Sequence, residues 1–122
     1  MAIKYSLIEI LTSEGARWRG KPLALAIVDY AAKQKIALRC AVFRGLAGCY
    51  ENGEIANRDI VILSLNMPVK IEIVLPSTQL ETILPRIEEM VEDSIVFVRE
   101  VDVLVFRSRK HLIPRNIKVK DV

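Results

Sequence analysis

The sequence has few of the residues from which catalytic and metal sites are usually built. Among 122 residues it contains one histidine and two cysteines. The histidine, His111, has no cysteine or carboxylate cluster beside it, so we do not expect it to bind a metal. One histidine with scattered Ser and Thr residues also provides no nucleophile with an adjacent base. We therefore expect a protein without a metal site and without enzymatic activity.

Long apolar runs and aromatic residues are also scarce. No run of about eighteen uncharged apolar residues occurs, so no membrane span is expected. Glu9, Glu14 and Arg17 interrupt the layout of a secretion signal. Cys40 and Cys49 match no zinc or redox spacing and indicate free thiols in a reducing cytoplasm. Aromatic residues make up 6% of the chain, too few for the stacking surface of an RNA-binding sheet.

The composition predicts a single globular domain. Apolar residues make up 52% of the chain and charged residues 27%, which suffices for one modest core. The formal net charge of +3 suits an anionic ligand without requiring nucleic acid. From Arg107 onward the chain becomes basic and loses its periodicity. We expect a domain over residues 1–107 and a basic C-terminal tail over residues 108–122.

Apolar periodicity predicts the order strand, helix, strand, strand, helix, strand. The expected strands cover residues 2–11, 37–46, 60–65 with 69–74, and 95–106, and the expected helices cover residues 21–34 and a segment that starts at Pro76. This order is that of an α+β, ferredoxin-like fold, in which an antiparallel sheet carries both helices on one face. A monomer would leave the other face exposed, so we expect an oligomer formed through the sheet.

The second helix has two further sequence features. Thr78 and Glu81 have the spacing of a capping box, in which side chains bind free N–H groups at the helix start. Pro85 lies inside the expected helix, where a proline bends the helix or separates its first turn.

The segment that follows the second strand is the candidate functional region. Gly45 and Gly48 break the strand pattern, and the polar loop 48–59 follows. Glycine permits close approaches of the backbone, and its N–H groups can converge on an anion. Loops on a rigid sheet often carry function. The alternative is that both glycines serve only the turn.

Four stretches of the chain resemble the PII-like superfamily, also called the GlnB superfamily, and one branch of it in particular. They are residues 18–23 (WRGKPL), 41–48 (AVFRGLAG), 67–74 (MPVKIEIV) and 84–91 (LPRIEEMV). The resemblance implies a regulatory homotrimer in the cytoplasm whose sheets line a central core. It also implies an adenine nucleotide (ATP, ADP or AMP) as effector in the cleft between subunits, and a mobile loop over residues 48–59 that signals to a protein partner, a transporter or an enzyme.

The resemblance assigns roles to individual residues. The implied nucleotide-binding residues are Lys21, Arg44, Gly45, Gly48, Arg107 and Arg109. The implied partner-binding residues of the loop are Tyr50, Glu51, Asn52 and Arg58. Arg and Lys can neutralise phosphates, and a helix start favours an anion. The branch has Gly-Phe-Gly where this chain has Gly48-Cys49-Tyr50, which keeps open a trimeric adaptor that has lost nucleotide binding.

Two further alternatives come from the fold class. One is a nucleic-acid binder that uses the sheet, which the low aromatic content argues against. The other is a metal-handling trimer similar to the CutA proteins, for which the lone histidine offers little support.

Overall fold

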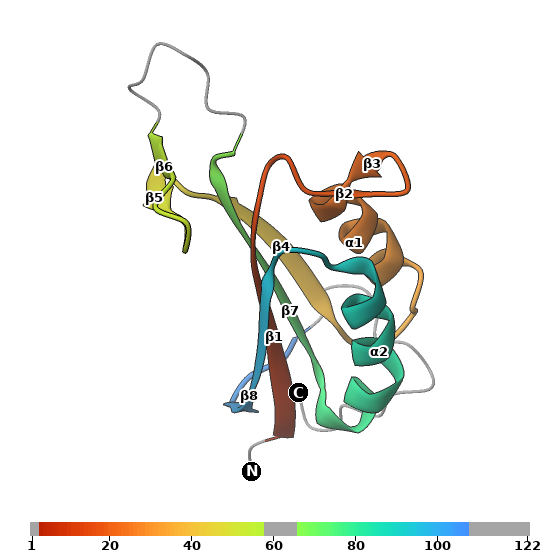
Figure 1. Cartoon of the computed structure of the whole chain (residues 1–122). Coiled ribbons are helices and arrows are strands. Elements are labelled where there is room, and N and C mark those ends of the chain that lie inside the picture. The colour runs from red at the N-terminus through yellow and green to blue at the C-terminus, as the bar shows by residue number, and fades with distance from the viewer. Residues whose placement is uncertain (1–2, 58–65, 108–122) are drawn as a thin grey trace.

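The computed structural model describes residues 3–57 and 66–107 (Figure 1). In chain order the elements are β1 (Ile3–Ser13), β2 (Arg17–Trp18), β3 (Lys21–Pro22), α1 (Leu23–Ala32), β4 (Arg39–Arg44), β5 (Ala47–Cys49), β6 (Ile55–Asn57), β7 (Pro68–Pro76), the 3-10 turn η1 (Ser77–Gln79), α2 (Leu80–Met90) and β8 (Ile95–Val103). Neither α-helix of these described residues has the length and apolar character needed to cross a bilayer.

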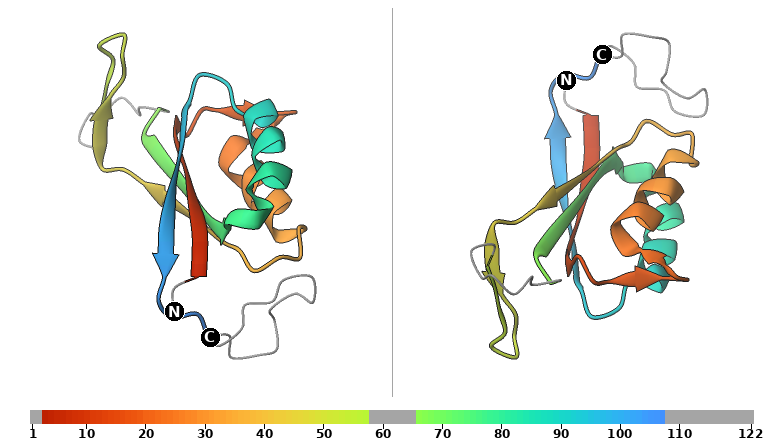
Figure 2. Two further views of the ribbon diagram at one scale, coloured as in Figure 1. Left: turned by 90° about the horizontal axis from the view of Figure 1, so that it is seen from below. Right: turned by 90° about the horizontal axis from the view of Figure 1, so that it is seen from above.

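The main sheet has four antiparallel strands in the order β4-β7-β1-β8. Both helices lie on one face of this sheet, and Figure 2 shows them stacked on the same side in two views. The order of the strands and the one-sided helices confirm the predicted ferredoxin-like fold.

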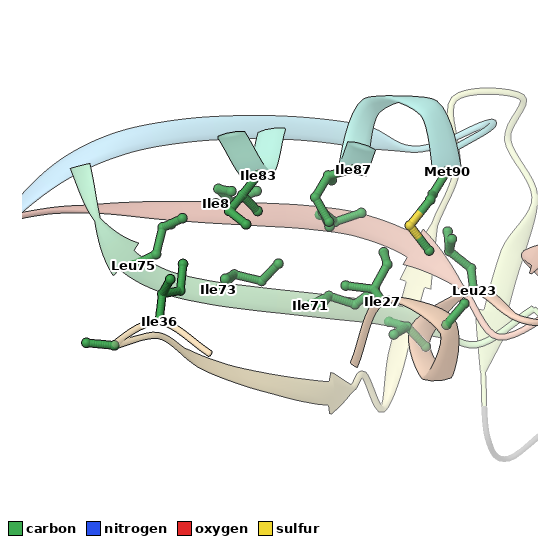
Figure 3. Close-up of a cluster of buried hydrophobic side chains, with 14 residues drawn as sticks. Ile8, Leu23, Ile27, Ile36, Ile71, Ile73, Leu75, Ile83, Ile87 and Met90 are labelled. Carbon is green, nitrogen blue, oxygen red and sulfur yellow. The ribbon is translucent and has the colours of Figure 1, made fainter. Parts of the chain in front are cut away.

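The hydrophobic core lies between the sheet and the helices (Figure 3). Ile8 lies opposite Ile73, and Ile10 lies opposite Ile71, so these side chains share one face of the sheet. Helix α1 contributes Ile27 to the same cluster, and α2 contributes Ile83 and Ile87. These isoleucines are fully buried, and each such burial stabilises the fold by about 1.5–3 kcal/mol. The alternation along β1 and β7 and the helical spacing in α2 therefore bring these side chains into one core, which holds the helices against the sheet.

We call the opposite side of the sheet the open face. The register of the strands places Leu11, Phe43, Ile95 and Phe97 there. Leu11 and Glu9 alternate with Ile8 and Ile10 along β1 and point to the opposite face, and Leu11 pairs with Lys70 and Ile95, Glu9 with Phe97, and Phe43 with Lys70. Phe43 is 47% exposed and Ile95 is 56% exposed. Large apolar side chains gathered on one exposed face are typical of an interaction surface.

Charged pairs cross the same open face. Glu9 is buried, and its Oε1 accepts a hydrogen bond from Arg99 Nη2 at 2.6 Å. On the neighbouring strand, Lys70 Nζ lies 3.1 Å from Glu72 Oε2. The open face is therefore a mixture of apolar side chains and neutralised ion pairs.

The first helix begins later than predicted. The expected start at residue 21 is wrong, because Lys21–Pro22 form β3 and pair with β2. Arg19 and Gly20 connect the two short strands with φ values of 48° and 82°. Two consecutive residues with positive φ are typical of a tight two-residue hairpin. This hairpin leads directly into α1 at Leu23.

The predicted capping box of the second helix is wrong. No side-chain hydrogen bond caps η1 or α2. Instead the chain enters the helix through the 3-10 turn η1, and the hydroxyl groups of Ser77 and Ser6 lie 2.9 Å apart. Pro85 lies inside α2, as predicted.

The loop after the second strand has a structure of its own. Strand β4 ends at Arg44 rather than at residue 46, and β5 and β6 form a separate two-stranded sheet. Figure 1 shows this hairpin projecting from the end of the main sheet, away from the helices. The predicted strand over residues 60–65 and the tail over residues 108–122 lie outside the described residues.

Candidate functional site

A pocket of about 370 Å³ lies where the hairpin leaves the sheet. We call it the loop pocket. Its lining includes Leu11, Phe43, Arg44, Gly45, Tyr50 and Glu51. It combines side chains from the C-terminal ends of β1 and β4 with the first residues of the loop.

Two glycines allow Pro68 to pack against the base of the loop. A Cβ at Gly45 would lie 2.6 Å from Pro68 Cγ, and one at Gly48 would lie 3.0 Å from the same atom. The Gly45 N–H also donates a hydrogen bond to the Pro68 carbonyl at 2.7 Å. That N–H is therefore already bound, and Gly45 contributes to the pocket through its small size.

Two of the predicted nucleotide-binding residues, Arg44 and Lys21, are neutralised within the chain. Arg44 Nη2 lies 2.6 Å from Glu14 Oε2. Lys21 Nζ lies 3.3 Å from Asp29 Oδ2 in α1, and Lys21 lines neither this pocket nor the next one. A phosphate at either side chain would have to compete with a carboxylate.

Tyr50 closes the base of the loop. Its hydroxyl donates a hydrogen bond to the Asn66 carbonyl. This bond connects the two ends of the chain segment that runs from residue 50 to residue 66. Burial, followed by the nearby Glu54 carboxylate, raises the pKa of Tyr50, so this hydroxyl stays protonated at neutral pH. Tyr50 thus lines the loop pocket and is also hydrogen-bonded to Asn66, at the far end of the loop.

The tip of the hairpin carries the other described loop residues. Asn52 Oδ1 accepts a hydrogen bond from the backbone N–H of Glu54 at 2.9 Å, which stabilises the turn. Glu51 and Asn52 also line a small acidic hollow together with Glu54 and Asp93.

A second pocket, of about 540 Å³, lies at the other end of the sheet. We call it the arginine pocket. Its lining includes Tyr5, Arg39, Glu72, Val74, Phe106 and Arg107. These residues come from the N-terminal ends of β1 and β4, the C-terminal half of β7 and the segment after β8. The two pockets therefore lie at opposite ends of the open face.

Tyr5 is the most deeply buried polar side chain of the arginine pocket. It is 1% exposed, and its hydroxyl has no hydrogen-bond partner within the described part of the chain. Burial raises the pKa of Tyr5. Its ring lies 6.3 Å, between centroids, from the ring of Phe106. A buried hydroxyl without a partner is uncommon and costs stability.

The chain matches the DUF190 family, whose description reads "Uncharacterized ACR", over residues 5–103. This match covers most of the sequence. The chain belongs to this family. Among solved structures, this DUF190 chain is similar to CPII, a nitrogen regulatory PII-like protein from Thiomonas intermedia K12 bound to ADP, AMP and bicarbonate. The TM-score is 0.52 at 18% identity, and the alignment covers 84% of this chain and 91% of that chain.

A second CPII structure from the same organism, bound to ADP and bicarbonate, aligns with a TM-score of 0.49 at 19% identity. It covers 84% of the DUF190 chain and 91% of the CPII chain. At this identity the first likeness establishes the fold alone, and it confirms the ferredoxin-like fold predicted for a single chain.

The DUF190 chain distributes its predicted site residues over separate places. Arg44 and Gly45 line the loop pocket, with Gly48 beside it, whereas Arg107 lines the arginine pocket. Lys21 lies apart from both. Two predicted residues, Arg58 and Arg109, lie outside the described residues.

Two pocket residues, Arg39 and Tyr5, were not predicted from the sequence. Arg39 is the one charged residue in the apolar run 37–43, and this interruption was the available signal. Nothing in the sequence marks Tyr5, because alternation predicts burial without revealing whether a hydroxyl finds a partner.

The described part of the chain offers no metal site. Within residues 3–57 and 66–107, no group of three or more His, Cys, Asp or Glu side chains could hold an ion. Cys40 and Cys49 are free thiols, and burial raises the pKa of Cys40 to about 11. Cys49 is exposed on the hairpin.

Proposed function

We propose that this DUF190 protein is a PII-like regulatory homotrimer that binds an adenine nucleotide between subunits. The observation that carries the proposal is the position of the two pockets at opposite ends of one open, partly apolar face. In a closed ring, unlike ends of neighbouring subunits meet. The loop pocket of one subunit then adjoins the arginine pocket of the next. The interface between the subunits brings together residues that lie apart within one chain.

The volumes and chemistry of the two pockets suit this ligand. Pockets of about 300–1,000 Å³ that are mostly apolar with a few polar groups are typical ligand sites. The structural likeness to CPII, whose structure is bound to ADP and AMP, supports an adenine nucleotide as the ligand here. In this proposal the ligand-binding residues are Lys21, Arg44, Gly45, Gly48, Arg107 and Arg109.

The β5–β6 hairpin is the proposed signalling element. Tyr50 contacts both the loop pocket and Asn66, so a ligand in the pocket can alter how the loop is held. A partner protein, a transporter or an enzyme, would then recognise Glu51, Asn52 and Arg58. The free thiols Cys40 and Cys49 support a reducing, cytoplasmic setting.

The test is a ligand screen on the purified trimer. Thermal shift and titration calorimetry with ATP, ADP and AMP, each with and without bicarbonate, should reveal binding to the folded state. Guanine nucleotides are the matched control. Absence of any heat or any shift with millimolar adenine nucleotide would contradict the proposal.

The second candidate is a trimeric adaptor that binds no nucleotide. The ion pairs of Arg44 and Lys21 and the occupied Gly45 N–H favour it, because all three groups are already satisfied. The variant Tyr50→Gly separates the two candidates. Nucleotide binding that appears only in this variant supports the adaptor, and binding by the unmodified chain supports the sensor.

A further inference from the structure

The arginine pocket is lined by two arginines whose guanidinium groups form no ion pair within the described chain. Arg39 begins β4, and Arg107 follows β8. Neither forms an ion pair among residues 3–57 and 66–107. The other strand cations of the open face, Lys70 and Arg99, are each paired with a carboxylate. The uncompensated positive charge of this face is therefore concentrated in the arginine pocket.

Two like charges that face one cavity repel each other, and an anion between them removes this repulsion. The planar guanidinium group binds phosphate with two parallel hydrogen bonds, which makes arginine well suited to such a ligand. Glu72 also lines the pocket, but Lys70 Nζ lies 3.1 Å from its carboxylate. The pocket therefore remains positive despite this acid.

The loop pocket has the opposite character. Its two cations are paired, Arg44 with Glu14 and Lys70 with Glu72, and its lining also includes the acidic residues Glu51 and Asp93. Leu11 and Phe43 give it apolar walls. These features suit the base of a nucleotide and disfavour its phosphates.

We propose that the phosphates of the ligand bind in the arginine pocket, where Arg39 and Arg107 together select nucleoside di- and triphosphates over monophosphates. This inference rests on the proposed function. It adds Arg39, which neither the sequence motifs nor the resemblance pointed to. In a di- or triphosphate, each of the two guanidinium groups can bind a different phosphate group. A monophosphate has one phosphate group, so it can bind fully to only one of the two arginines.

The experiment measures the binding of ADP, AMP and tripolyphosphate to the full chain by titration calorimetry. Arg39→Gln and Arg107→Gln each remove one guanidinium group. Arg17→Gln is the matched control, because Arg17 is exposed in β2, lines neither pocket and forms no ion pair among the described residues. Circular dichroism and sedimentation verify that each variant keeps its fold and its oligomeric state.

The expected result is that Arg39→Gln weakens ADP and tripolyphosphate binding by about tenfold or more, the loss of a charge-assisted hydrogen bond. It should weaken AMP binding by a smaller factor, and Arg17→Gln should change none of them. Binding of ADP that Arg39→Gln leaves intact overturns this inference and leaves the proposed function standing. Binding of tripolyphosphate that depends on Arg39, without binding of any adenine nucleotide, supports the anion site and overturns the proposed function.

Discussion

The hydroxyl of Tyr5 offers a sharp test of how the arginine pocket is built. This oxygen is buried without a hydrogen-bond partner among the described residues. An unsatisfied buried hydroxyl costs about 1–3 kcal/mol. Tyr5→Phe removes the oxygen and keeps the ring that contacts Phe106. We expect the variant to gain about 1 kcal/mol in unfolding free energy and to melt about 4 °C higher for a domain of this size.

The assay is urea and thermal unfolding without nucleotide, at one protein concentration, because assembly and ligands shift apparent stability. Tyr50→Phe is the matched control. It loses the hydrogen bond to the Asn66 carbonyl, so it should lose about 1 kcal/mol. A loss of stability in Tyr5→Phe as large as in Tyr50→Phe would refute the reasoning, since it means that the Tyr5 hydroxyl is bonded in solution.

The pH dependence gives a second readout for the same variant. Burial raises the pKa of Tyr5 above its ordinary value of 10.0. Above pH 10.0 the unfolded chain therefore releases this proton while the folded chain keeps it, so the stability of the unmodified protein falls as pH rises. Tyr5→Phe lacks this group, and its advantage should grow in that range.

Three further predictions concern the loop base and the thiols. Gly45→Ala places a Cβ 2.6 Å from Pro68 Cγ, and it should lower the free energy of unfolding in urea by about 1–3 kcal/mol. Gly48→Ala places its Cβ 3.0 Å from the same atom and should cost less. Equal stability of both variants and the unmodified chain would contradict this packing. At pH 8 iodoacetamide should alkylate exposed Cys49 faster than Cys40, as mass spectrometry can follow, because burial raises the pKa of Cys40 and leaves few of its thiols ionised. Because burial raises the pKa of Cys40 from 9.0 to about 11, stability should fall between these pH values, and Cys40→Ala should flatten this decline.

Much of the fold could be predicted because burial leaves a periodic trace in the sequence. Ile71 and Ile73 alternate with Lys70 and Glu72, and this alternation correctly identified β7 as a strand with one buried face. The helical spacing around Ile83 identified α2 in the same way.

The connections were harder to predict, since they depend on local conformations without a strong sequence signal. Arg19 adopts a positive φ, which a non-glycine residue rarely does, and so the hairpin before α1 was missed. The spacing of Thr78 and Glu81 fits a capping box, but it cannot reveal that the chain enters the helix through a 3-10 turn.

The electrostatics of the site could not be predicted from the sequence, for a different reason. Arg44 pairs with Glu14, thirty positions away, and only the fold brings them together. The motif therefore located a basic residue without revealing that it is neutralised. Conversely, Arg39 has no motif around it, and its importance follows from its place beside Arg107 in one pocket.

Sedimentation equilibrium of the unmodified chain tests the central claim most directly, since the proposed site exists only where two subunits meet. We predict a single species of about 41 kDa, three times the 13.8 kDa of one chain, at micromolar concentration. A well-behaved species of 13.8 kDa under the same conditions would contradict the account.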